Sequence, residues 1–198
     1  MSVRIDELGN HVEIISGQIM TRIAAKDDDP NFISTRKVVI PKAITSDGFI
    51  SVEDMPEEKL KAEPPVDRIT RVNDIIIKLS TPFDSAIVTK ESEGCIVPSF
   101  CAIIRNGNTL DLDYLRAFLA SQNCKEQLKT KVSGAVTSIL SIGKIKSVEI
   151  PVADAKAQRR IGEYYREAQN NLQIMSQIIA LENKRNDVMF QELVKGVK

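Results

Sequence analysis

The sequence predicts an α+β protein in two parts: a globular mixed-sheet domain over residues 1–152 and one long coiled-coil helix over residues 153–198. Three observations predict this. Short apolar segments rich in β-branched residues alternate with turn residues as far as Pro151, which is typical of strands. No proline follows Asp154, and apolar residues then recur every 3.5 residues on average, which indicates a supercoiled helix. The apolar fraction of 42% and the charged fraction of 27% are those of a globular protein.

The sequence of the first part of the domain predicts strands separated by turns. A short polar segment leads into the apolar run His11–Ser16, which we expect to end in a turn at Gly17. Phe32–Ile40 is rich in β-branched residues and predicts a strand that ends at Pro41. The highly charged segment Glu53–Lys61 predicts a short helix instead.

More strands are predicted in the middle of the chain. Asp74–Leu79 is a nearly continuous apolar run, as in a strand that is buried on both faces. Ala86–Thr89 and Cys95–Ile104 are two further strand candidates, separated by the turn residues 91–94.

Helical spacing replaces the strand pattern after residue 111. Leucines over Leu112–Val132 predict a helix, with Asp111 or Asp113 as its N-cap. A second, short helix is predicted over residues 133–143, and Val148–Ile150 is the last predicted strand.

The predicted coiled-coil seam follows alternating steps of four and three residues. The residues that we expect to pair with another helix are Ile161, Tyr165, Ala168, Leu172, Met175, Ile179, Glu182, Asn186, Met189 and Leu193. Glu182 and Asn186 would be polar positions that set the register. At 1.5 Å per residue the helix is roughly 60 Å long, more than the preceding domain could cover. The alternative is an amphipathic helix that lies along the chain's own domain.

Charge and cysteine usage narrow the class of protein. The 27 basic and 27 acidic residues cancel, which argues against a free-standing DNA-binding protein because phosphate binding normally needs a basic surplus. The charges are uneven, since residues 122–148 carry five lysines against one glutamate and residues 53–63 are acidic. Cys95, Cys101 and Cys124 lack paired spacing and predict reduced, buried thiols in the cytoplasm. No apolar run reaches the ~18 residues of a membrane span.

The residue patterns of known catalytic and metal sites are missing from the sequence. His11 is the single histidine, so neither a Ser-His-Asp triad nor a Cys/His metal site can be assembled. There is no Gly-rich phosphate loop. Pro64-Pro65 is followed by Val66, unlike the Asn/Asp-Pro-Pro-aromatic motif of adenine methyltransferases. The sequence therefore predicts a non-catalytic protein without a cofactor or metal.

Four segments together resemble one known family. Ile15–Ile19 resembles the entry to a target-recognition domain, and Arg71–Leu79 resembles a Val-x-x-Gly-Asp strand motif in which Asn73 replaces the Gly. Leu112–Leu119 resembles an Asp-x-x-Tyr-Leu helix. A closing signature matches at Gly134, Leu140, Ile150, Pro151, Gln158 and Ile161. In this order, the segments resemble the specificity subunit of type I restriction-modification systems.

The resemblance implies a half-length subunit. Residues 1–152 would be a target-recognition domain that reads double-stranded DNA, and residues 153–198 would space two such domains and dock methyltransferase subunits, which a restriction subunit joins in the complex. Because a full-length subunit has two domains and two helices, this chain would pair with a second copy and read an interrupted palindrome. Two alternatives are a coiled-coil protein-binding adaptor without DNA recognition and an enzyme of unrecognised type.

DNA contact needs cations and hydrogen-bond donors on exposed loops. Three segments supply the candidate DNA-binding residues: Thr35, Arg36, Lys37, Lys78, Ser80, Thr81, Lys129, Lys131, Ser133, Gly134 and Thr137. Arg36 is the candidate for a bidentate contact to guanine, and Gly134 would let the backbone approach DNA closely. Aromatic residues make up 5% of the chain, with no Trp, which argues against stacking on single-stranded or flipped bases.

Overall fold

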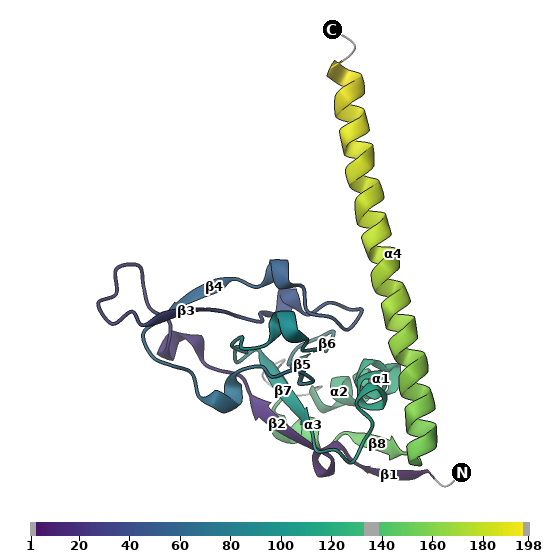
Figure 1. The fold of residues 1–198 in the computed structure, drawn as a ribbon. Helices are drawn as coiled ribbons and strands as arrows, with labels where there is room; N and C mark the ends of the chain where they lie inside the picture. Colours follow the sequence, from purple (N-terminus) through teal and green to yellow (C-terminus); the bar gives the residue numbers. More distant parts are fainter. Residues whose placement is uncertain (1–2, 133–138, 196–198) are drawn as a thin grey trace.

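The computed structural model describes residues 3–132 and 139–195. These residues form a domain of short strands and helices, from which one long helix extends (Figure 1). The strands are β1 (Arg4–Glu7), β2 (Val12–Ser16), β3 (Ser34–Lys37), β4 (Glu57–Leu60), β5 (Ile75–Lys78), β6 (Ser85–Ile87), β7 (Cys101–Asn106) and β8 (Glu149–Val152), and the helices are α1 (Leu112–Ala120), α2 (Gln122–Val132), α3 (Ile142–Lys146) and α4 (Ala155–Lys195). The predicted α+β class with a long C-terminal helix is confirmed.

A four-stranded antiparallel sheet in the order β2-β7-β5-β6 forms the centre of the domain. In β5, Ile75 lies opposite Ile104 of β7. Because side chains alternate along a strand, Ile75 and Ile77 belong to the hydrophobic cluster with α1 and α2, whereas Ile76 belongs to a second cluster. The predicted strand at Asp74–Leu79 is therefore confirmed, and it is buried on both faces.

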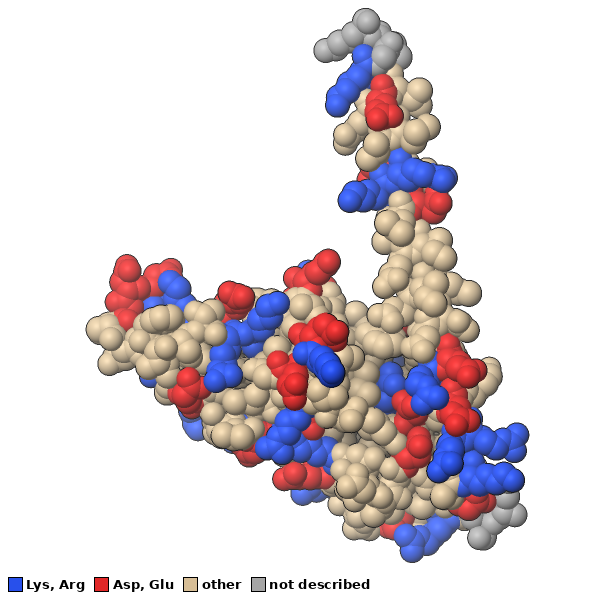
Figure 2. Space-filling model, in the orientation of Figure 1, with Lys and Arg blue, Asp and Glu red and all other residues tan. Residues whose placement is uncertain are grey.

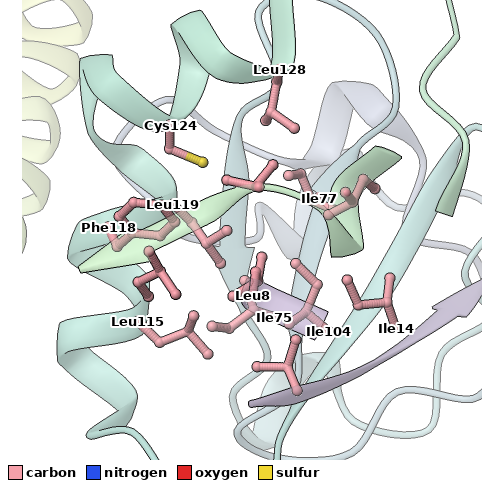
Figure 3. Packing of buried hydrophobic residues seen from close by; sticks show 14 of the residues in the cluster. Leu8, Ile14, Ile75, Ile77, Ile104, Leu115, Phe118, Leu119, Cys124 and Leu128 are labelled. Atoms are coloured by element: carbon pink, nitrogen blue, oxygen red, sulfur yellow. The ribbon is translucent and has the colours of Figure 1, made fainter. Parts of the chain in front are cut away.

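Two helices cover one face of this sheet. Leu115, Leu119 and Leu128 reach from α1 and α2 into the cluster that contains Ile75 and Ile104 (Figure 3). All of these side chains are almost completely buried. Burial of each large aliphatic side chain stabilises the fold by about 1.5–3 kcal/mol, so this layer fixes both helices on the sheet.

The predicted single helix Leu112–Val132 is two helices in the structure. Ser121 separates them with an extended backbone conformation. Its hydroxyl donates to the Phe118 carbonyl at 2.6 Å and accepts from the Cys124 N–H at 3.2 Å. One side chain therefore satisfies backbone groups at the end of α1 and at the start of α2.

The predicted helix at Glu53–Lys61 is wrong, because this segment contains β4. This strand pairs antiparallel with β3. Leu60 is fully buried beside Ile23 and Ile96, and this non-local contact outweighs the local helix preference. The other segments are shorter than predicted: Phe32–Ile40 contains β3, and the strand expected from Cys95 begins only at Cys101.

The last elements before α4 also differ from the sequence-based expectation. Of the short helix predicted over 133–143, residues 133–138 lie outside the described part of the chain, and α3 begins at Ile142. Pro151 lies inside β8 instead of ending the strand, and it is opposite Ile5 of β1. The β1-β8 sheet has two strands, so both are edge strands, and a proline is tolerated there because its nitrogen, which carries no hydrogen, can face away from the partner strand. β1 therefore joins the start of the chain to the point where α4 leaves the domain.

α4 has 41 residues and is about 60 Å long. Its first turns pack against α1, and the remainder extends away from the domain (Figure 1). All residues from 174 to 195 are exposed. The alternative in which the helix lies along its own domain is therefore wrong for most of its length. Within the described residues, none of the helices has the length and apolar character needed to cross a membrane.

Candidate DNA-contact and helix-pairing surfaces

The first predicted DNA-binding segment lies on β3, at the far side of the domain from α4 (Figure 1). Thr35 is exposed, whereas Arg36 and Lys37 are half-buried. Arg36 lies opposite Glu58 in the β3-β4 ladder, and its Nη2 atom is 3.2 Å from an oxygen of Glu63. The acidic segment 53–63 is therefore the direct neighbour of the basic strand, and it neutralises much of the charge of that strand.

The second predicted segment contains a lysine that is already paired. The Nζ atom of Lys78 is 3.1 Å from Asp84 Oδ2, and the Nζ atom of Lys125 in α2 is 2.9 Å from Asp84 Oδ1. Burial of Asp84 raises its pKa, but the hydrogen bonds and charges of Lys125 and Lys78 more than offset burial and hold the pKa of this carboxyl below its usual value. Lys78 thus holds β5 to α2 through Asp84, whereas Ser80 and Thr81 remain exposed.

The third predicted segment begins on α2. Lys129 is exposed and lies one helical turn after Lys125, on the same side of α2. Lys131 is half-buried and lines a shallow hollow of about 400 Å³ with Thr130 and Glu149. The remaining candidates of this segment, Ser133, Gly134 and Thr137, lie outside the described residues.

The second segment is joined through Asp84 and Lys125 to α2, the helix that carries Lys129 and Lys131, whereas the first segment lies apart on β3. The Leu140 N–H donates to the Leu79 carbonyl at 2.8 Å, so the turn that carries Ser80 and Thr81 lies beside Leu140, just before α3. On the face shown in Figure 2, basic and acidic side chains alternate over the domain without forming one large basic patch.

Phe100 is an exposed residue on this surface that the sequence-based selection missed. The Leu79 N–H donates to the Phe100 carbonyl at 3.0 Å, so Phe100 lies next to the Ser80–Thr81 turn. Its side chain is 61% exposed, which is unusual for such a large apolar group. The signal in the sequence is its position after Pro98-Ser99, a turn pair that places Phe100 just before the start of the buried strand β7.

The predicted helix-pairing residues divide into two groups. Tyr165 and Ala168 are half-buried near the chain's own domain, and Ile161 lines a small apolar hollow with Tyr114 of α1. From Leu172 onward the seam residues are exposed, and Glu182 is paired with Arg185 at 2.7 Å. The pairing surface that is open to another molecule therefore starts at Leu172.

A second apolar stripe on α4 was missed. Ile174, Ile178, Leu181 and Val188 are about half exposed or more and follow the same heptad spacing beside the predicted seam. Because a helix advances about 100° per residue, the two stripes together cover nearly half of its circumference. Residues 168–181 contain no charged side chain, so this part of α4 is uncharged in Figure 2.

The apolar side of α4 faces away from the domain. The side chains or Cα atoms that meet α1 and its neighbours belong to Gln158, Gly162 and Tyr165. At 100° per residue, the centre of the apolar side is about 150° from the centre of this group. Another helix can therefore run beside α4 without colliding with the domain that α4 carries.

A metal site is not evident in the described part of the chain, because residues 3–132 and 139–195 contain no suitable group of three His, Cys, Asp or Glu side chains. The cysteines are buried. Burial raises the pKa of both Cys101 and Cys124 to about 12, so these thiols are poor nucleophiles at neutral pH.

No known protein-family profile and no curated protein matches the sequence. The fold is similar to that of a chain in a structure on complex assembly and conformational transition of the type I R-M system, at 20% identity and a TM-score of 0.67 over 98% of this chain and 49% of that chain. It is also similar to the HsdS subunit from Thermoanaerobacter tengcongensis, at 20% identity and a TM-score of 0.66 over 94% of this chain and 47% of that chain.

A third similar structure is the type I restriction-modification S subunit from M. genitalium, at 12% identity and a TM-score of 0.59 over 93% of this chain and 43% of that chain. The chain thus spans about half the length of the solved chains that it matches. Its fold is that of one half of a type I restriction-modification specificity subunit, with one domain and one long helix. The resemblance found in the sequence is confirmed at the level of the fold.

Proposed function

We propose that this chain is a non-catalytic, sequence-specific DNA recognition subunit that gives target specificity to the methyltransferase and restriction subunits of a restriction-modification complex. The observation that carries the proposal is the fold match over 98% and 94% of this chain. It includes α4 as well as the domain, so the match covers the recognition module together with its spacer. The chain would act in the cytoplasm, where its thiols stay reduced.

Self-association is supported by the exposed apolar side of α4. Two copies that pair through the seam starting at Leu172 would restore two domains and two helices. The exposed fractions of Leu172, Met175 and Ile179 are 48%, 58% and 61%, and such a row of apolar side chains is stabilised by burial against a second helix. A two-fold axis between the copies places identical domains at both ends, which requires an interrupted palindromic site.

Methyltransferase docking is supported by the width of the apolar side of α4. One partner helix covers the seam of a two-stranded coiled coil. Ile174, Ile178, Leu181 and Val188 would then remain exposed beside that seam. A helix from a methyltransferase subunit is the occupant that fits this second stripe, and the result would be a bundle of more than two helices.

DNA contact would centre on the Ser80–Thr81 turn and on the last turn of α2, which carries Lys129 and Lys131. The hydroxyls and ammonium groups supply donors to phosphate and base edges, and Phe100 supplies an apolar contact of the kind that recognises a thymine methyl group. Ser133, Gly134 and Thr137 follow Lys131 in the sequence and remain candidates for the same DNA contact. Thr35, Arg36 and Lys37 form a separate candidate on β3, where the acidic residues of β4 reduce the attraction for phosphate.

The alternative is a protein-binding adaptor that has no DNA recognition. Two observations favour the adaptor. The net charge is zero, and Arg36 and Lys78 are paired with Glu63 and Asp84, which leaves fewer cations to bind phosphate. Such an adaptor would bind its partners with little dependence on salt and would select no DNA sequence.

The test combines mass measurement with selection of DNA. Light scattering should give a dimer for the wild-type chain, and duplex selection with the methyltransferase partner should enrich one interrupted palindrome. The variant Ile179→Asp places a charge on the seam and should give a monomer. Gln177→Asp places the same charge on the polar side of α4 and should leave the dimer intact. A monomeric wild-type chain would contradict the pairing. A dimer that binds the methyltransferase partner but enriches no DNA sequence would favour the adaptor over the proposed function.

A further inference from the structure

The start of α4 is fixed to α1 by a close approach at Gly162. A Cβ atom at Gly162 would lie 2.6 Å from Asp111 Oδ1 and 2.9 Å from the Tyr114 backbone nitrogen. Asp111 is the N-cap of α1, and its Oδ1 accepts from this same N–H at 3.0 Å. Only glycine allows α4 to cross the capped end of α1 at this distance.

Gln158, one helical turn before Gly162, also fixes the position at which α4 crosses α1. This glutamine is almost completely buried. Its Oε1 accepts from the Asp111 N–H at 2.9 Å, and its Nε2 donates to the Ala153 carbonyl at 2.8 Å. The side chain therefore ties α1 to the segment between β8 and α4. The Tyr114 hydroxyl donates to the Pro151 carbonyl, which links α1 to β8 at the same place.

An ion cluster fixes the rotation of α4 one turn further along. Asp113 of α1 binds Arg166 of α4 and Arg116 of α1, each at 2.7 Å. The guanidinium of Arg116 lies over the ring of Tyr165 at 5.6 Å and over the ring of Phe49 at 5.9 Å. Cation–π contacts of this kind are directional, so the cluster opposes twisting of α4 as well as tilting.

The junction is the place where the direction of the long helix is decided. Beyond Leu172, α4 extends into solvent (Figure 1). A domain of about 150 residues is roughly 40 Å across. A pivot of about 5° at the junction therefore moves the far side of the domain by about 3.5 Å, close to the 3.4 Å rise of one base-pair step along DNA.

We propose that Gln158, Gly162 and the Asp113–Arg116–Arg166 ion cluster set the number of base pairs between the two half-sites, by holding each domain at one angle to the helix pair. This inference rests on the proposed function. Arg166 and Gly162 act in different ways. Arg166 restricts the angle, whereas Gly162 sets its value, because any larger residue there displaces α4 from α1.

The first test is selection from a duplex library in which the two half-sites are separated by spacers of every length from two to twelve base pairs. The wild-type dimer should select one spacer length. Arg166→Ala should keep the half-site sequence but reduce the preference for this spacer over its neighbours about three- to fivefold, as expected for a partly exposed ion pair. Arg166→Lys should restore much of the preference. Gly162→Ala should move the preferred length by at least one base pair.

Arg160→Ala is the matched control. Arg160 is exposed on the same part of α4, roughly opposite the side that meets α1, and its loss should leave the spacer unchanged. A general loss of stability would lower the recovery of all spacers equally, so it is distinguished from a change in the spacer distribution. Variants at Arg166 and Gly162 that select the wild-type spacer as sharply as the parent would overturn the proposal and leave the proposed function standing. A wild-type chain that selects no interrupted site would overturn both.

A second measurement reads the junction without DNA. Val66 and Lys184 are exposed, and the native cysteines are buried, so Val66→Cys/Lys184→Cys provides two spin-label sites. The labelled chain is diluted with excess unlabelled chain, so that distances within one copy dominate in pulsed electron spin resonance. The parent should give one narrow distance distribution, which Arg166→Ala broadens and Arg160→Ala leaves unchanged. A parent distribution as broad as that of Arg166→Ala would overturn the inference of a rigid junction.

Discussion

The variant Asp84→Asn tests whether Lys78 stabilises the fold through its ion pair with Asp84. Asp84 is almost completely buried and receives one ammonium from β5 and one from α2, Lys78 at 3.1 Å and Lys125 at 2.9 Å. Asparagine keeps the size of the side chain but removes its charge. Two neighbouring lysines would then repel each other without a counter-ion.

The expected loss follows from the exposure of the two lysines. Their side chains are 16% and 23% exposed, so water replaces the lost contacts only in part. A hydrogen bond to a charged group contributes about 1.5–3 kcal/mol, and breaking a buried ion pair costs about 3–5 kcal/mol. We expect a decrease in the free energy of unfolding of about 2–4 kcal/mol, near the lower end because the ammonium groups reach solvent.

Urea unfolding at pH 7 measures this difference. With a denaturant slope of about 2 kcal/mol per molar, the midpoint should fall by about 1–2 M. The variants Lys78→Met and Lys125→Met, alone and with Asp84→Asn, complete a double-mutant cycle that isolates each pair. A midpoint shift below about 0.3 M for Asp84→Asn would refute the reasoning, and Lys78 would then be available for phosphate.

The pH dependence provides a separate check with a defined sign. The pKa of Asp84 is lowered in the folded state from its usual 3.8. A group with a lowered folded pKa contributes stability above its unfolded pKa and loses it as the pH falls through the folded value. The wild-type advantage over Asp84→Asn should therefore be complete above about pH 5 and shrink below pH 4.

Three further predictions concern other parts of the chain. Glu63→Gln should release Arg36 and, if β3 contacts DNA, raise the affinity for duplex DNA about threefold at low salt; titration by fluorescence anisotropy measures this, and an unchanged affinity would exclude β3 from the interface. Ser121→Ala should lower the free energy of unfolding by about 1 kcal/mol through loss of the cap between α1 and α2, measured by thermal or urea unfolding, whereas full retention of stability would show that the cap is dispensable. Cys101 and Cys124, with a pKa of about 12, should resist a thiol reagent at pH 8 until urea unfolds the domain, and rapid native labelling would contradict their burial.

Sequence patterns predicted the elements whose cause is local or periodic. The apolar run at Asp74–Leu79 indicates a strand with two buried faces, because a short continuous run of β-branched residues between turn signals is typical of a strand in the centre of a sheet. The heptad spacing after Asp154 likewise predicts a long helix. The helix predicted at Glu53–Lys61 failed because Leu60 finds its burial in β4 against Ile23 and Ile96, and these partners are distant in sequence.

For the candidate DNA-contact residues too, sequence patterns do not show which distant residues are neighbours in the fold. The sequence predicts that Lys78 is an exposed cation at the end of a strand. In the structure Lys78 forms an ion cluster with Asp84 and Lys125, which joins β5 to α2. Arg36 is the candidate for a guanine contact in the sequence, yet the acidic segment about twenty residues later is its neighbour in the antiparallel β3-β4 ladder. Charge counted along the chain does not reveal which opposite charges meet in space.

The sequence by itself determined that this protein has an α+β domain and a long apolar-faced helix, because strand alternation and heptad spacing are properties of consecutive residues. Only the tertiary structure decided at which angle the helix leaves the domain and which of the candidate cations are held in ion pairs within it. Both depend on contacts between distant segments: Gly162 against the capped end of α1, Arg166 against Asp113, and Lys78 against Asp84. Such contacts exist only after the sheet and helices have packed, since folding alone brings those groups within a few ångströms of one another.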